Sequence, residues 1–450
     1  MRSNDPIVKQ FWQYALPTVA AMLVNGLYQV VDGIFIGHYI GAAGLAGINI
    51  AWPLIGTMVG VGMMIGVGTG ALSSIKQGEG NLVQAKEAFS SGVWLFLLLP
   101  PVFAPLLYWV GDDIIGLQAS QGPELQMAEQ YLDILIFALP ATFGSIALPF
   151  LLRNDNNPNL ATTLMVIGAV ANIVLDYVFI AVLQWELQGA ALATALAQSI
   201  VTVIGLGYFF TPYANLRLKL SDCSFNLKYI PEIFGIGLSS LFMYAYSSIM
   251  IAMHNWMFSV YGSGVTIGAY AIVGYIVTVY YLVAEGFANG MQPLVSYNFG
   301  ARKVDNILKV LKAAMTVTVV GGMAFVGLLY LFPEQVVGIF NENDPDLAAQ
   351  TILGMRIHLC VVFMDGFLVV AAALYQGMGL GRKAIIVSLS NILFQVPFLL
   401  LLPKYFGVEG VWAAFPLSNI ALTVIVIVVM IGDLRRLKSG ELLRRPVVAA

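Results

Sequence analysis

Residues 26–41 read GLYQVVDGIFIGHYIG, so a single carboxylate, that of Asp32, interrupts an apolar stretch of a membrane-length segment. An aspartate near the middle of a membrane helix opposes insertion by about 2.5 to 3.5 kcal/mol, and it is retained where it faces a bundle interior or a watery cavity. The stretch therefore predicts a membrane helix whose carboxylate has a function. A structural hydrogen bond to a neighbouring helix is the alternative.

The composition places the whole chain in a membrane. Hydrophobic residues make up 59% of the 450 residues and charged residues only 10%, whereas about a quarter of the residues of a soluble domain are charged. The net charge of −3 gives no basic footprint for nucleic acid. The two cysteines, Cys223 and Cys360, have no metal-ligand spacing. We therefore expect a polytopic membrane protein.

Apolar runs of about twenty residues, long enough to cross a bilayer, give the number of spans. Several runs exceed thirty residues, so tilted or kinked helices are expected. The sequence predicts an all-α protein with twelve transmembrane helices. They fall near residues 11–37, 44–75, 88–110, 129–152, 158–183, 187–211, 229–260, 266–297, 307–332, 347–379, 384–402 and 408–432.

The basic residues test this count, because lysine and arginine accumulate in the short cytoplasmic loops of membrane proteins. With the N-terminus inside, all 21 lysines and arginines except Lys404 and Arg356 fall in inner segments. The outer loops carry acids such as Asp112, Asp113 and Glu334. Both termini are therefore expected to be cytoplasmic.

Two similar loops indicate an internal repeat. Residues 76–89 read KQGEGNLVQAKEAF and residues 297–311 read YNFGARKVDNILKVL, and each is a basic, glycine-bounded loop that leads into a new helix. Six spans per half give both halves the same orientation, which is a parallel repeat of the kind found in transporters. The sequence thus predicts two pseudo-symmetric six-helix bundles. The first lobe is 1–215, the second is 216–450, and a cytoplasmic linker lies near 211–229.

Polar residues in the first and fifth spans point to a shared site. Asn172 and Asp176 are four residues apart and so lie on one helical face, as do Tyr28 and Asp32. Both faces fall at or above mid-membrane on helices that cross in the same direction, so we interpret them as the walls of one polar cavity. The alternative is that Asp176 extends its carboxylate to the nearby outer loop. Facing carboxylates would make a proton-coupled switch, and the same oxygens could instead collect Na⁺.

The second half offers weaker candidates. Asp365 lies near the middle of the tenth span, where function and an interhelical hydrogen bond are equally reasonable interpretations. Glu285 lies nearer the cytoplasmic end of the eighth span, which favours a structural or gating role. The histidines His38, His254 and His358 show no paired spacing, so no metal site is predicted. No nucleotide-binding motif occurs, so any pumping must draw on an ion gradient.

Twelve spans in two halves, together with VDGIFIGHYIGAAGLA (31–46), NIVLDYVFI (172–180) and GMQPLVSYNFGARK (290–303), resemble the multidrug and toxic compound extrusion family. The resemblance is closest to its DinF and MepA-like bacterial branch. It implies a cation antiporter of the bacterial inner membrane that expels amphiphilic, often cationic drugs by alternating access between two lobes. It also implies a monomer with membrane lipids around it, no cofactor, no enzymatic activity and no nucleic-acid partner.

By this resemblance, Asp32 with Tyr28 matches the first-span coupling site, Asn172 and Asp176 match the fifth-span cluster, and Thr194 matches the sixth-span threonine. The tenth-span aspartate of the other main branch resembles Asp365. Tyr246 or Ser247 stands where that branch has a glutamate, so the first-lobe cluster is favoured as the cation site.

The resemblance favours proton coupling, and the alternatives are a Na⁺-coupled drug antiporter or a lipid-linked precursor flippase of the same superfamily. A flippase should line its cavity with several arginines to bind pyrophosphate, and only Arg356 lies within a span. An intramembrane aspartyl protease is disfavoured, because the sequence has Asp176-Tyr177 and Met364-Asp365-Gly366 in place of the motifs of that class.

Overall fold

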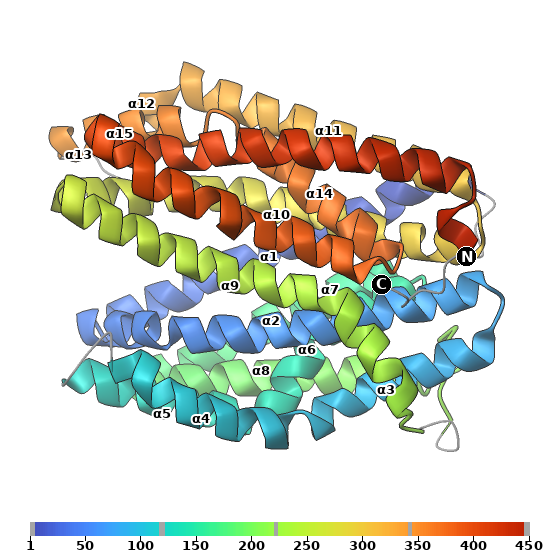
Figure 1. Ribbon diagram of the computed structural model, residues 1–450. Helices are drawn as coiled ribbons and strands as arrows, with labels where there is room; N and C mark the ends of the chain where they lie inside the picture. Colours follow the sequence, from blue (N-terminus) through green and yellow to red (C-terminus); the bar gives the residue numbers. More distant parts are fainter. Residues whose placement is uncertain (1–4, 117–121, 220–223, 341–343, 445–450) are drawn as a thin grey trace.

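The computed structural model describes residues 5–116, 122–219, 224–340 and 344–444, and within these ranges the chain is helical and contains no strand. Figure 1 shows the helices running alongside one another in a single bundle. The elements are α1 (Ile7–Tyr39), α2 (Ala42–Gly78), α3 (Leu82–Leu98), α4 (Pro100–Gly116), α5 (Pro123–Phe137), α6 (Leu139–Asn154), α7 (Pro158–Asp176), the π-helix η1 (Tyr177–Val182), α8 (Glu186–Tyr208), the 3₁₀ turn η3 (Leu227–Tyr229), α9 (Ile230–Tyr261), α10 (Gly264–Gly300), α11 (Val304–Leu331), α12 (Pro333–Gly338), α13 (Pro345–His358), α14 (Val362–Gly377), α15 (Gly381–Lys438) and the 3₁₀ turn η4 (Leu442–Arg444).

The number of membrane spans follows from these helices. Among the described residues, eight helices are long and apolar enough to cross a membrane, and three bent pairs bring the number to eleven. α15 has 58 residues and would be about 87 Å long if straight, nearly three times the thickness of a hydrocarbon core. It is broken at Gly407, where φ is 57° and ψ is −135°. Division there gives the twelve spans that the sequence predicts.

Three of the predicted spans are not continuous helices, and here the sequence prediction was incomplete. The ranges 88–110, 129–152 and 347–379 each fall on two helices, bent by 44°, 67° and 51° respectively. Pro100 begins α4 and Pro140 is the second residue of α6, and proline removes a helical donor and restricts the residue before it. The proline positions therefore explain two of the three bends.

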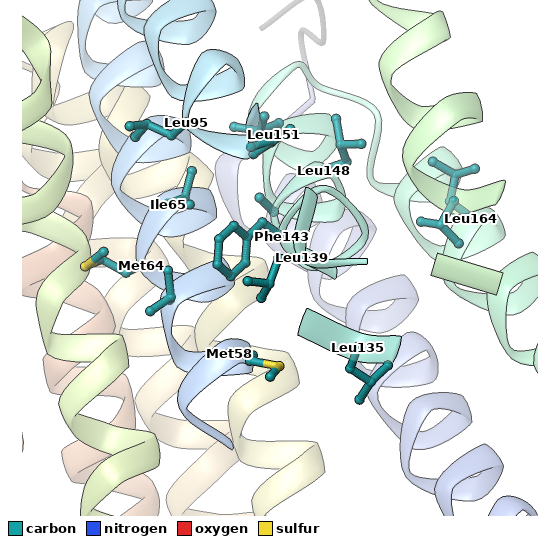
Figure 2. Packing of buried hydrophobic residues seen from close by; sticks show 14 of the residues in the cluster. Met58, Met64, Ile65, Leu95, Leu135, Leu139, Phe143, Leu148, Leu151 and Leu164 are labelled. Carbon is teal, nitrogen blue, oxygen red and sulfur yellow. The ribbon is translucent and has the colours of Figure 1, made fainter. Parts of the chain in front are cut away.

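Each of the two largest hydrophobic cores is built mainly from one half of the sequence. In Figure 1 the helices α2 to α6 lie below, in blue to teal, and α10 to α15 lie above, in yellow to red. Figure 2 shows the first core, in which Met58 and Ile65 of α2 face Leu139, Phe143 and other residues of α6. A second core joins α10, α11, α14 and α15.

α1 takes part in both cores. Phe11 and Ala15, near its beginning, are fully buried in the second core, whereas Ile36, near its end, is fully buried in the first. The helix begins at the end of the bundle where α15 ends, and we call this end the N-terminal face (Figure 1). α1 therefore connects the second core at the N-terminal face with the first core at the opposite face.

Close backbone contacts join the two halves near the N-terminal face. A Cβ atom at Gly237 of α9 would lie 1.9 Å from the carbonyl oxygen of Met64 of α2, and one at Gly300 of α10 would lie 2.0 Å from that of Ile75. Only glycine permits helices to approach so closely. Similar contacts join α10 to α1, and we call this set of α1, α2, α9 and α10 contacts the seam.

Candidate functional site

The first-half site is positioned by the packing of α7 against α1. The Thr162 hydroxyl of α7 donates a hydrogen bond to the Pro17 carbonyl of α1 at 2.8 Å. The two helices run in the same direction from this contact. Asp176 lies 14 residues beyond Thr162 and Asp32 lies 15 residues beyond Pro17, so each carboxylate stands about 21 to 23 Å further along its helix. The hydrogen bond thus sets a register that brings the two aspartates to one level.

Asp32 and Asp176 interact directly through their side chains. Asp176 is fully buried and Asn172, one turn earlier, is 2% exposed. Four oxygens here, both of the Asp176 carboxylate, Oδ1 of Asp32 and Oδ1 of Asn172, are buried and accept no hydrogen bond from the described residues. If both carboxylates are ionised, they repel each other and neither can donate a hydrogen bond to the other. A proton or a metal cation bound between them would relieve this repulsion. The arrangement suits a cation site.

A group of polar side chains surrounds the two carboxylates. The Asn172 amide donates to the Thr194 hydroxyl of α8 at 3.3 Å. Tyr131 of α5, which is 5% exposed, lies beside Thr194, and its hydroxyl lies near both aspartates. Tyr28 also lies near both. We call the six residues Tyr28, Asp32, Tyr131, Asn172, Asp176 and Thr194 the carboxylate cluster.

Tyr131 was missed by the sequence analysis. It stands in QYLDILIF (130–137), where a tyrosine in an apolar span usually fills the core, and no spacing to another polar residue marks it. A second local feature was also unforeseen: the backbone changes from α-helix to the π-helix η1 directly after Asp176. Short π segments occur often at functional sites. Here the change of pitch follows the last carboxylate of the cluster.

The second half holds its aspartate in a different setting. Asp365 of α14 is 8% exposed and lies beside the Tyr281 hydroxyl of α10. Tyr246 of α9 lies nearby and donates a short hydrogen bond to the Gln395 amide oxygen of α15. Asp365, Tyr281, Tyr246 and Gln395 form what we call the tyrosine network. Tyr246, one of the two residues expected at the position of the related branch's glutamate, therefore lies near Asp365.

Glu285 joins neither group. It accepts a hydrogen bond from the Asn289 amide at 3.5 Å and interacts electrostatically with Arg153 at the end of α6. Arg153 is 2% exposed, and its guanidinium lies 4.5 Å above the ring centroid of Phe150. Glu285 and Arg153 come from opposite halves of the sequence, so their interaction crosses between the halves.

Two of the histidines that look isolated in the sequence lie together. The ring centroids of His254 of α9 and His358 of α13 are 5.5 Å apart. Nδ1 of each ring lies at hydrogen-bond distance from a backbone carbonyl, Met250 for His254 and Trp412 for His358. Among the described residues, however, no group of three or more His, Cys, Asp and Glu side chains is arranged to hold a metal ion. The two histidines therefore belong to an aromatic core.

Comparisons with known proteins agree with this fold. The MatE family model matches residues 17–178 and 236–401. The multidrug export protein MepA of Staphylococcus saprophyticus is 24% identical over 444 residues, which cover 98% of this chain and 97% of that protein.

Solved structures with the same fold include a MATE protein in complex with MaL6, with a TM-score of 0.90 and 22% identity over 97% of this chain and 98% of that one. A multidrug resistance MATE family transporter of the MOP superfamily in an outward-facing conformation also has a TM-score of 0.90, with 22% identity over 96% and 97% of the two chains. At this identity the structures establish the fold.

Proposed function

Because the chain belongs to the MatE family, we propose that it is a secondary active multidrug efflux transporter that exchanges amphiphilic or cationic drugs for protons by alternating access. Membership of this family makes the chain a transporter and not an enzyme. The multidrug export name of its MepA relatives supports the substrate class. The single observation that carries proton coupling is the pair of facing carboxylates, Asp32 and Asp176: three of their four oxygens, both of Asp176 and Oδ1 of Asp32, are buried and lack donors among the described residues.

In this proposal, protonation of the carboxylate cluster changes the position of α1. One proton shared by Asp32 and Asp176 removes their repulsion and lets the side chains form a hydrogen bond. Loss of that proton separates them. α1 carries Asp32 near one end and is buried in the second core at the other, through Phe11 and Ala15. A change at Asp32 would therefore reach the seam along a single helix.

We further propose that the structure represents the outward-facing state. The glycine contacts hold the halves together near the N-terminal face, which in our assignment is cytoplasmic, because the basic residues concentrate there. The two moving bodies would be residues 1–215 and 216–450. The Glu285–Arg153 interaction adds a charged contact between them, consistent with a gating role for Glu285.

Na⁺ is the second candidate for the coupling ion, and a specific observation favours it. Asn172 Oδ1 is one of the four oxygens without a donor, and an amide oxygen is a ligand for a hard cation but binds no proton at ordinary pH. A lipid-linked precursor flippase is disfavoured, because Arg356 is exposed near the end of α13 and Arg153 is buried at the end of α6, where its guanidinium lies over Phe150.

Ethidium efflux from proteoliposomes, under an imposed pH gradient or an imposed Na⁺ gradient, tests this function. We expect efflux with the pH gradient alone, and we expect Asp32→Asn to reduce it at least 100-fold while thermal unfolding shows that the variant is folded. Efflux driven by the Na⁺ gradient alone would identify Na⁺, in place of the proton, as the coupling ion at this cluster. Absence of efflux under both gradients from a folded wild-type protein would contradict drug export, and efflux unchanged in Asp32→Asn would contradict the site.

A further inference from the structure

A groove of about 650 Å³ runs along the line where the beginning of α1 packs beside α11. It lies outside the carboxylate cluster, at the N-terminal face and on the exposed side of both helices. α1 contributes one wall and the first five turns of α11 contribute the other. The lining residues are Val8, Trp12, Lys309, Lys312, Ala313, Thr316, Val317, Val320, Gly321 and Ala324.

The groove has positive charge at one end only. Lys309 and Lys312 are exposed and three residues apart, so they project from one face of α11. Neither forms an ion pair with the described residues, and Asp5, the acid nearest on the α1 side, is already paired with Lys9 at 3.0 Å. A lysine ammonium binds phosphate as a point charge. This end of the groove is therefore suited to a phosphate group.

The remainder of the groove is apolar and has the length of an acyl chain. From Lys312 to Ala324 the helix rises about 18 Å, close to the roughly 15 Å depth of one leaflet of the hydrocarbon core. Trp12, 37% exposed, stands near the charged end, the depth at which tryptophan collects in membrane proteins. A soluble phosphate would leave this apolar wall uncovered, whereas a phospholipid would cover it.

We propose that this groove is a binding site for one anionic phospholipid of the leaflet on the side of the N-terminal face. The phosphate lies at Lys309 and Lys312, and one acyl chain follows α11 past Val317 and Gly321. Because the walls come from α1 and α11, which belong to different halves of the sequence, the lipid contacts both halves. Its occupancy holds the beginning of α1 beside α11.

Native mass spectrometry of the full-length protein in detergent, titrated with phosphatidylglycerol or phosphatidylethanolamine, measures this binding. We expect at least tenfold tighter binding of phosphatidylglycerol for the first lipid. The double variant Lys309→Gln/Lys312→Gln should lose this preference, by about fivefold for each lysine removed. The matched control is Arg435→Gln/Lys438→Gln, which removes two exposed charges with the same spacing at the same face and should leave the preference intact.

A second variant tests the apolar wall without altering charge. Nothing lies within 4 Å of a Cβ atom built on Gly321 or on Gly327, so leucine should be tolerated at both. Gly321→Leu fills the groove and should weaken binding of both lipids about tenfold, whereas Gly327→Leu, outside the groove, should not.

Three outcomes would overturn the proposal. The first is equal binding of the two lipids by the wild type. The second is an equal loss of the preference for phosphatidylglycerol in Lys309→Gln/Lys312→Gln and in the control Arg435→Gln/Lys438→Gln. The third is normal binding of phosphatidylglycerol by Gly321→Leu together with displacement of that lipid by soluble glycerol phosphate. Such a result would show that the site binds a phosphate group and no acyl chain.

Discussion

The carboxylate cluster and the tyrosine network each place a buried aspartate where helices of one half meet, but they balance its charge differently. In the first half, Asp176 faces a second carboxylate, Asp32, and accepts no hydrogen bond from the described residues. In the second half, Asp365 lies beside the Tyr281 hydroxyl, a potential donor, and among the described residues no second carboxylate acts on it. The first pair of carboxylates needs a bound cation to balance its charge, whereas the protein itself offers Asp365 a hydrogen-bond donor. The comparison predicts that the number of donors around an intramembrane acid, more than its burial, decides whether that acid exchanges a cation.

The largest expected difference between the two regions is in transport. Asp176→Asn should reduce pH-driven ethidium efflux at least 100-fold, because an amide cannot take part in a proton exchange with Asp32. Asp365→Asn is the matched control, since it makes the same chemical change in another buried acid, and should retain efflux within about threefold. Both rates are measured in proteoliposomes at equal protein density.

A large loss in Asp365→Asn would show that the second half also carries a coupling site. A small loss in Asp176→Asn would place proton coupling on Asp32 alone. In either case the contrast drawn from the donors would be wrong.

A smaller effect is expected from the tyrosine that the structure adds to the cluster. Tyr131→Phe removes a hydroxyl that lies beside Thr194, which accepts a hydrogen bond from Asn172. We expect about a tenfold lower efflux rate and a displaced pH profile, because loss of the hydroxyl changes the hydrogen bonding around both carboxylates. Tyr280→Phe, which loses a bond to the Thr318 carbonyl in the second half, serves as the control. A lower rate with an unchanged pH profile in Tyr131→Phe would indicate a packing role only.

The smallest effect should come from removing the potential donor beside Asp365. Tyr281→Phe leaves that carboxylate short of a hydrogen bond and should lower the free energy of unfolding by about 1 to 3 kcal/mol. Efflux by the protein that remains folded should change little. Thermal unfolding in detergent measures the stability, and an unchanged melting temperature would mean that Asp365 finds another donor at no cost.

Much of the fold and part of the site could be predicted from the sequence. Hydrophobic run lengths and the placement of lysine and arginine are local properties, and they gave twelve spans in an all-α chain. Asp32 and Asp176 were recognisable because a charge in an apolar run is costly wherever the run is buried. Prolines mark the bends at residues 99 and 138 in the sequence, namely Pro100 and Pro140. No proline marks the bend at residues 359–361, where an apolar run reads the same whether its helix is straight or bent.

The amino-acid sequence alone is enough to assign the membrane class, the number of spans and the acidic residues whose place in an apolar span is costly. Only the tertiary structure decided which of these acids meet. The Thr162–Pro17 hydrogen bond sets the level at which Asp176 faces Asp32. Packing of a third helix, α5, places Tyr131 near both. The tertiary structure also places His254 beside His358, which is about a hundred residues away in the sequence, and it places Tyr281 beside Asp365. The physical reason is that helix periodicity fixes which residues share a face, whereas the partner of that face depends on packing between elements distant in the chain.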